Sequence, residues 1–544
     1  MADAARLRES SFRLRARSRR APSLLVAATL AVAAVMVTPV VYLVVRASEA
    51  DAESWDLILR DRTVWLALRS AGLGLSVTAA AVTIGVPLAW LTTRTDLPLR
   101  RMWAVVVALP LVIPSYVGAF ALIAALGPRG MLQDLLSGVG VDHLYDIGGF
   151  PGAFLSLTLF TYPYVYLLTA AGIRGLDPSL EDACRSLGTP AWATFRRVTL
   201  PLLRPSIVAG GLLVALYALH DFGAVSLMRY PVFTQAIYLQ YRGAFDRTPA
   251  AILSLMLVGL AVVVLVLEQR ARGRARYFRS GTGTKKPLRP IELGRARIPA
   301  MIFCAAVTLI ALVLPVSVVG FWLGRGFAQG EEIRLTWAAA GGSVFVAGLG
   351  ALVSVAAAVP VAMLAARHPG RLTRSVERAT YIGYALPGIV VALAFVFFGA
   401  NFLPAVYQSI PLVVLAYVVL FLPQATEPLR SSLLQVGPGI EEAGRALGRG
   451  KLEVFARITA PLISRGALAG AALVFLTAMK ELPATLLLRP TGFETLATRV
   501  WTGATAGLYS KAAGPALLLV IICAVPLYIL ARRVEVSDVE VKPD

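Results

Sequence analysis

Long apolar runs recur along the whole chain, and they restrict its fold more than any other feature. A helix needs about 20 mainly apolar residues to cross the hydrocarbon core of a bilayer. Twelve runs of roughly this length carry few charges. We therefore predict an all-α polytopic membrane protein of about 12 transmembrane helices. Their approximate positions are 24–45, 65–93, 103–126, 152–173, 205–227, 249–267, 299–323, 338–366, 379–400, 410–429, 465–487 and 513–531.

The composition excludes most soluble classes. Of the 544 residues, 57% are hydrophobic and 15% are charged, whereas a soluble domain carries about 25% charged residues. The three cysteines are far apart and the three histidines do not cluster, so we expect neither a disulfide framework nor a metal site. No grouping of His, Cys or paired carboxylates indicates catalysis. We predict that the chain is not an enzyme.

The net charge of +21 is explained by membrane topology. Twelve helices place both termini on one side of the membrane. If that side is the cytoplasm, nearly the whole positive excess falls on the cytoplasmic face, as the positive-inside rule requires. The basic stretches Arg6–Arg20 and Arg270–Arg297 then fix orientation beside membrane lipid. No aromatic platform or nucleic-acid motif accompanies them, so we expect no nucleic-acid partner.

The chain is an internal duplication. Residues 181–205 and 441–465 share ten of 25 positions at a constant offset of 260. Six apolar spans in each half make this a parallel repeat about an axis along the membrane normal. The predicted domains are a basic cytoplasmic N-terminus (1–23), a first transmembrane domain (24–268), a cytoplasmic linker (269–297), a second transmembrane domain (298–531) and a cytoplasmic tail (532–544).

The duplicated segment predicts two short helices bent at a glycine. In the first copy Asp177-Pro178 provides an N-cap and a first-turn proline. Gly188 suits the left-handed position that ends a helix, and a second short segment runs to Pro201. An amphipathic hairpin packed on the protein's own helices would have the same pattern. Its presence in both halves favours the docking of a two-fold-symmetric partner.

The spacing resembles the EAA loop of ABC-importer permeases, in which E-A-A is followed after three residues by Gly and after nine more by I-x-L-P. The triplets fall on Asp182-Ala183-Cys184 and Glu442-Ala443-Gly444, so the match is imperfect. The resemblance implies that each loop is a coupling helix docked on a homodimeric ATPase. The residues assigned to this role are Glu181, Asp182, Ala183, Gly188, Pro201, Glu441, Glu442, Ala443, Gly448 and Pro461.

ATP hydrolysis is expected in a separate subunit, because the chain has no G-x-x-x-x-G-K-[ST] phosphate-binding loop. We therefore expect this chain to bind no cofactor of its own. A 6+6 secondary transporter is the remote alternative from a different class. It would carry a glycine/Asp-Arg motif between spans 2 and 3, where this chain reads RTDLPLRR, and would not need a two-helix loop in each half.

Two charged pairs lie deep in the predicted spans. A charge in the membrane is energetically costly, so such a residue usually has a function or a charge partner. His220-Asp221 and Lys480-Glu481 are related by the same offset of 260. We place them in the translocation pathway and hypothesise an Asp221–Lys480 contact at an outer gate, broken when the pore opens. Local satisfaction of these groups at the outer interface is the alternative.

The segments DFGAVSLMRY and KELPATLLLRPTGFETLATRVW, with EQRARGRARYFRS at the start of the linker, resemble the ferric-iron branch of these permeases. That resemblance implies Fe³⁺ import across a bacterial inner membrane, fed by a periplasmic or lipid-anchored binding protein. Permeases for thiamine, sulfate, molybdate or polyamines share the same loops, so these substrates remain alternatives.

Overall fold

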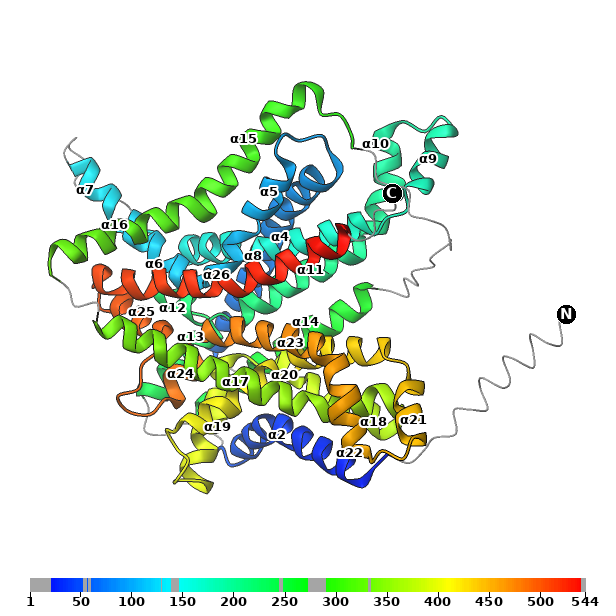
Figure 1. Ribbon diagram of the computed structural model, residues 1–544. Helices are drawn as coiled ribbons and strands as arrows, with labels where there is room; N and C mark the ends of the chain where they lie inside the picture. The colour runs from blue at the N-terminus through cyan, green and yellow to red at the C-terminus, as the bar shows by residue number, and fades with distance from the viewer. Residues whose placement is uncertain are drawn as a thin grey trace. The chain divides into compact units, whose positions relative to one another are not determined.

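The computed structural model describes residues 21–539 except 52–55, 57–59, 129, 138–145, 244–247, 273–289 and 331–333. Its regular structure is helical (Figure 1), with an isolated β-bridge between Thr95 and Ile291. The predicted all-α class is confirmed. The basic N-terminal residues 1–20, most of the predicted linker and the last five residues of the tail lie outside the described residues.

The sequence half before the linker contains the following elements: α2 (Ser23–Ser48), α4 (Asp61–Arg94), α5 (Arg100–Val106), η1 (Leu109–Val112), α6 (Ser115–Leu126), α7 (Met131–Ser137), α8 (Phe150–Arg174), α9 (Pro178–Ser186), α10 (Ala191–Thr194), η2 (Phe195–Thr199), α11 (Leu200–His220), α12 (Gly223–Leu227), α13 (Phe233–Gly243) and α14 (Thr248–Arg272).

The half after the linker contains η3 (Gly294–Ala296), α15 (Arg297–Thr308), η4 (Leu309–Val313), α16 (Leu314–Ala328), α17 (Arg334–Arg367), α18 (Arg371–Thr380), η5 (Tyr381–Ala385), α19 (Gly388–Phe402), α20 (Ile410–Gln435), α21 (Pro438–Ala446), α22 (Lys451–Val454), η6 (Phe455–Thr459), α23 (Ala460–Met479), α24 (Pro483–Leu488), α25 (Leu496–Thr505) and α26 (Tyr509–Val539).

The number of membrane spans agrees with the sequence prediction. Among the described residues, eleven helices are long and apolar enough to cross a membrane. A twelfth results if the bent pair made by 371–383 and 388–402 counts as one broken span.

Two predicted spans are interrupted by proline. The span expected at 103–126 is broken before α6, and the span expected at 379–400 is broken before α19. Pro114 and Pro387 occupy the N-cap positions of these helices with the same backbone angles, φ −61° and ψ 145°. Proline has no N–H to donate and favours an extended residue before it, so each apolar run divides into two pieces.

Two other spans were predicted too far along the chain. The runs at 205–227 and 465–487 each contain the end of a long helix and the start of a short one. The long helices end at His220 (α11) and Met479 (α23), and the short helices begin at Gly223 (α12) and Pro483 (α24). The hydropathy of the run does not reveal such a break, because apolar residues continue on both sides of the charged pair that lies there.

The described chain packs as two compact units. One consists of residues 21–41, 345–384 and 409–478; the other consists of the described residues within 42–344, 385–408 and 479–539. These units are defined by packing, whereas the domains predicted above are defined by the duplication.

In the larger unit, α4, α8 and α11 lie against one another (Figure 1). Gly210 of α11 faces α8 so closely that a Cβ there would lie 2.7 Å from the Cα of Val165. A small residue lets two backbones approach, which is how membrane helices pack in the absence of a hydrophobic driving force between them.

The smaller unit repeats this contact 260 residues later. A Cβ at Gly470 of α23 would lie 3.1 Å from the Cα of Ala425 of α20. A second small-residue contact is reversed between the halves: Gly172 of α8 faces Ser206 of α11, whereas Gly466 of α23 faces Ser432 of α20. Each half thus retains one glycine and one serine at this crossing.

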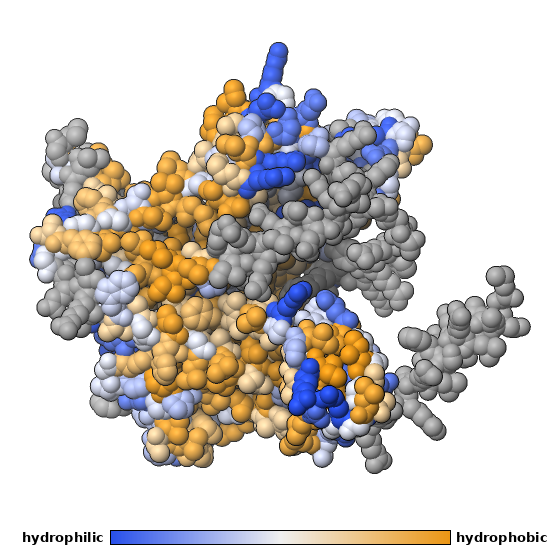
Figure 2. All heavy atoms as spheres, viewed as in Figure 1, coloured by the Kyte–Doolittle hydropathy of each residue, from blue (hydrophilic) through white to orange (hydrophobic). Residues whose placement is uncertain are grey.

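Hydrophobic side chains cover much of the face drawn in Figure 2. Many large apolar residues of the long helices are exposed, including Leu68 and Leu75 of α4 and Phe345 and Leu352 of α17. Exposed apolar surface on this scale is expected where lipid tails replace water.

Candidate functional site

The first repeated loop (residues 177–201) forms the predicted pair of short helices. The Asp177 carboxylate caps α9 by accepting a hydrogen bond from the Ser179 N–H at 3.0 Å. Gly188 ends the helix with φ +80°, a conformation that disfavours a Cβ. The Thr189 N–H donates to Cys184 O and the Gly188 N–H donates to Arg185 O, which is the Schellman pattern.

The second repeated loop (residues 437–461) has the same backbone path. Gly448 has φ +83°, and the Arg449 and Gly448 N–H groups donate to Gly444 O and Arg445 O. Gly437 replaces the capping aspartate and provides no side-chain hydrogen bond. In both loops a four-residue helix and a five-residue π-helical turn then lead into the next long helix.

Adjacent acidic residues in these loops have opposite environments. Asp182 and Glu442 are exposed, as are the alanines that follow them. Glu181 and Glu441 are buried. Sequence position had grouped all four acids together, but of these four only Asp182 and Glu442 are accessible to a partner. Pro201 and Pro461 are exposed second residues of α11 and α23.

Large apolar residues also project from both loops. Leu187 and Leu447 are 85% and 82% exposed, directly before the two glycines. Trp192 and Leu452 are exposed at the start of the second short helices. Such side chains beside an exposed acid are typical of a surface that binds another protein.

The buried acids are bound by arginines that the sequence had not indicated. Arg94, the last residue of α4, forms an ion pair with Glu181. Arg367, the last residue of α17, binds Glu441 at 2.9 Å. An arginine at the end of a membrane span is typical of the positive-inside rule, so no sequence signal distinguishes these two from their neighbours.

The charged pairs predicted for the pathway lie at the helix breaks. His220 is the last residue of α11, and Lys480 follows α23. Asp221 is buried and accepts hydrogen bonds from the Ala224 and Val225 N–H groups at 2.9 and 3.3 Å. Its carboxylate therefore stabilises the N-terminus of α12, where free N–H groups favour negative charge.

Glu481 has the corresponding role in the second half. Its Oε1 accepts a hydrogen bond from the Ala484 N–H of α24 at 2.9 Å. The helices that begin after Pro114 and Pro387, α6 and α19, provide the residues that lie against these two acids. Ser115 donates a hydrogen bond to Asp221, whereas Gly388, which would place a Cβ 2.5 Å from Glu481 Oε1, leaves room for the longer acid.

The hypothesised Asp221–Lys480 ion pair is not formed in this conformation, judged on the residues that the structure describes. Lys480 Nζ instead donates to Leu111 O at 3.1 Å. Leu111 and Ser115 lie on either side of the break at Pro114. The two charges therefore bind neighbouring parts of one broken span, each with its own partner.

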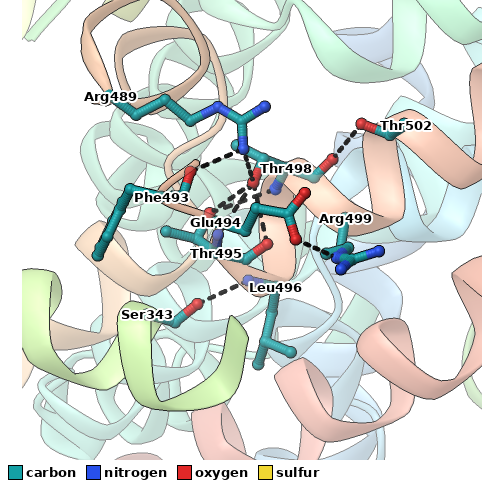
Figure 3. Close-up of polar contacts among 9 residues, drawn as sticks. All are labelled: Ser343, Arg489, Phe493, Glu494, Thr495, Leu496, Thr498, Arg499 and Thr502. Atoms are coloured by element: carbon teal, nitrogen blue, oxygen red, sulfur yellow. Dashed lines mark hydrogen bonds and ion pairs between the residues drawn. The ribbon is translucent and has the colours of Figure 1, made fainter. Parts of the chain in front are cut away.

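The loop after α24 is stabilised by a polar network (Figure 3). Arg489 donates from Nη1 to Phe493 O at 2.9 Å and to Thr498 Oγ1 at 3.1 Å. Thr495 and Thr498 form a capping box at the start of α25. The network fixes the path of the chain between the short helix α24 and α25.

In each half a serine from a long helix binds the first N–H of a later helix, α13 in the first half and α25 in the second. Ser343 Oγ of α17 accepts from the Leu496 N–H at 2.7 Å (Figure 3), and Ser70 Oγ of α4 accepts from the Phe233 N–H at 3.1 Å. This serine contact therefore recurs in both sequence halves. Among the described residues, no three His, Cys, Asp or Glu side chains are close enough together to hold a metal ion.

A comparison against protein families matches both halves of the chain. The family described as binding-protein-dependent transport system inner membrane component matches residues 81–277 and 358–536, one match in each half. The chain belongs to this family of ABC-importer permeases. This confirms a transport rather than catalytic protein of the multi-pass membrane class, and it excludes the 6+6 secondary transporter.

Individual relatives extend the match to nearly the whole permease. This chain is 32% identical over 499 residues to the "Fe(3+)-transport system permease protein FbpB 2" of Haemophilus influenzae. The alignment covers 91% of this chain and 95% of the relative. This chain is 24% identical over 467 residues to the "Probable ABC transporter permease protein y4fN" of Sinorhizobium fredii, covering 80% of each. The "Molybdenum transport system permease protein ModB" of Escherichia coli is 29% identical over 208 residues, 36% of this permease and 90% of ModB.

Proposed function

We propose that this permease carries ferric iron across a bacterial inner membrane, as the membrane subunit of a binding-protein-dependent ABC importer. The observation that carries the proposal is the similarity over almost the full length of both chains to the Haemophilus influenzae protein named for Fe(3+) transport. The molybdenum permease is less similar, at 29% identity over 208 residues, so molybdate is a weaker candidate.

The repeated loops are proposed as the docking points for the ATPase. Each presents an exposed acid, an exposed alanine and a strongly exposed leucine in the same order. Small residues permit close approach, and an exposed leucine can fill an apolar pocket of the partner. Two equivalent loops in one chain suit a homodimeric ATPase, whose two-fold symmetry presents the same groove twice.

The remaining partners follow from the family and from the sequence. The chain lacks a phosphate-binding loop, so ATP is bound and hydrolysed by the separate subunit, and this chain needs no cofactor. A periplasmic or lipid-anchored protein delivers the substrate to the opposite face. Both termini and both repeated loops are on the cytoplasmic side.

The helix breaks that hold His220, Asp221, Lys480 and Glu481 are proposed to border the pathway. Rigid membrane helices end here, and short helices with capped N-termini follow. Non-helical backbone within a membrane is tolerated where it is buried in protein or lines a cavity. An Asp221–Lys480 pair, if it closes a gate, forms in another state of the transport cycle.

The test is uptake of radiolabelled ferric iron in cells from which this gene and redundant iron systems have been deleted. Labelled thiamine and molybdate serve as parallel arms. Loss of iron uptake alone, restored by the wild-type chain, supports the proposal. Unchanged iron uptake with loss of molybdate or thiamine uptake refutes the ferric assignment and leaves the importer architecture intact.

A further inference from the structure

Two buried ion pairs connect the repeated loops to long helices that are remote in sequence. Arg94 and Glu181 are 87 residues apart, and their side chains are 6% and 10% exposed. Arg367 and Glu441 are 74 residues apart, and theirs are 12% and 8% exposed. In both cases the arginine ends a membrane helix and the glutamate lies in the first helix of a loop.

The two ion pairs have additional partners, which differ between the halves. Glu181 Oε1 accepts a hydrogen bond from Thr199 Oγ1 at 2.8 Å, so it also joins α9 to the π-helical turn before α11. In the second half Arg367 Nη2 donates to Val436 O at 2.9 Å, at the end of α20. The feature common to both is the arginine–glutamate pair itself.

This common feature persists although the surrounding loops have diverged. Asp177 caps the first loop, whereas Gly437 provides no cap in the second. A buried charge is costly unless it is paired and hydrogen-bonded, so the retention of such a pair in both halves indicates more than a surface contact. A surface ion pair would contribute little.

The position of α4, which carries Arg94 of the first ion pair, allows it to transmit a displacement of the first loop to other helices. α4 packs along both α8 and α11. In the last third of α4, a Cβ at Gly85 would lie 3.0 Å from the backbone of Tyr162 and Tyr166 in α8. Closely packed helices move as one body rather than deforming, so a shift at Arg94 is passed on to α8.

We propose that Arg94 and Arg367 are positioning residues for energy coupling, each binding its repeated loop to a long helix so that a movement of the loop displaces that helix. The proposal rests on the proposed function, because it requires the loops to dock an ATPase. It assigns coupling to the ends of α4 and α17 in addition to α11 and α23, which the loops join covalently. The exposed acids contact the partner, and the buried acids transmit the displacement.

The experiment uses the whole permease with its ATPase, reconstituted in proteoliposomes. ATPase activity stimulated by the binding protein and substrate uptake are measured together, and their ratio is the readout. In R94M/R367M we expect assembly with ATPase to persist and uptake per ATP hydrolysed to fall about tenfold, a typical size for a coupling term. R94K/R367K, which keeps the positive charges, should retain more uptake per ATP hydrolysed than R94M/R367M. R101M, which removes an exposed arginine of α5, is the matched control.

A structural role alone would lower the amount of assembled complex without changing uptake per ATP. An unchanged ratio in R94M/R367M would overturn the proposal. If that variant does not assemble, the charge exchange R94E/E181R decides: recovered uptake supports the pairing, and absent recovery overturns it. A wild-type complex that neither hydrolyses ATP under stimulation nor transports would instead refute the proposed function.

Discussion

Lys480 Nζ donates a hydrogen bond to the backbone oxygen of Leu111 at 3.1 Å. The lysine comes from the second sequence half, and the carbonyl belongs to the broken third span of the first half. Pro114 interrupts the helical hydrogen-bond ladder at this point, which leaves carbonyls there open to side-chain donors. Asp221 binds Ser115 on the other side of the same break. The break is therefore where charges from both halves meet.

The gate hypothesis predicts a non-additive response to substitution. D221A and K480A should each lower substrate uptake, and the double variant should lower it by less than the product of the two, with a coupling of about 1 kcal/mol. K511A, which removes an exposed lysine, should transport normally. Independent effects of the two substitutions on uptake would show that the residues do not form a gate.

Removal of the exposed acids should weaken ATPase docking. In D182A/E442A we expect the two docking contacts to be lost together, with about tenfold weaker ATPase association if the pair is worth roughly 1.4 kcal/mol. Association is measured by co-purification in detergent, and uptake is measured in parallel. E49A removes an exposed acid that pairs with Arg46 in a surface contact and should be neutral. Wild-type association in D182A/E442A would remove the docking role.

The second half should not tolerate the serine that the first half uses. In G388S the new Cβ would lie 2.5 Å from Glu481 Oε1 and 3.1 Å from Pro483 Cγ. We expect the free energy of unfolding to fall by roughly 1–3 kcal/mol, as is typical when a side chain overpacks its site. The second-site change E481D shortens the acid and recreates the Ser115–Asp221 pair, so it should restore part of the stability.

Thermal unfolding in detergent measures this series, with E481D alone as the reference. G388A separates the volume of the side chain from its hydroxyl group. The compensation is disproved if G388S/E481D is no more stable than G388S.

The end of the linker should detach in acid from Asp96, which lies just after α4. The backbone N–H of Leu293 and the Arg297 guanidinium, which lies 2.6 Å from the Asp96 carboxylate, lower the pKa of that carboxyl below its ordinary value of 3.8. Because the folded-state pKa is depressed, the contact is fully present above pH 3.8 and is lost as the pH falls through the lower folded value.

Hydrogen exchange at the Leu293 amide, corrected for the intrinsic effect of pH, measures this contact. We expect protection at neutral pH that falls in strong acid, and low protection in D96A at every pH. D61A, at the other end of α4, is the control. Wild-type protection in D96A would show that Asp96 does not hold the linker.

Several features of the permease were readable from sequence because their causes are local or set by the bilayer. Span length follows from membrane thickness, so the number of spans was predicted correctly. Asp177 and Gly188 act within one helical turn, so the bend of the first loop was also predicted. The helix breaks at Pro114 and Pro387 were missed, since proline occurs within other membrane helices here, such as α8 at Pro163, without ending them.

The amino-acid sequence by itself determined the membrane class, the duplication at an offset of 260 and the two glycine-bent loops. Only the tertiary structure decided which acid of each loop is buried and what binds it. Glu181 and Asp182 are adjacent acids of the same helix turn, and no local pattern separates them. Their environments differ because Arg94, 87 residues earlier, ends its helix beside one of them. Such a pairing is created by the packing of whole helices, and sequence periodicity reports only neighbours within a few turns.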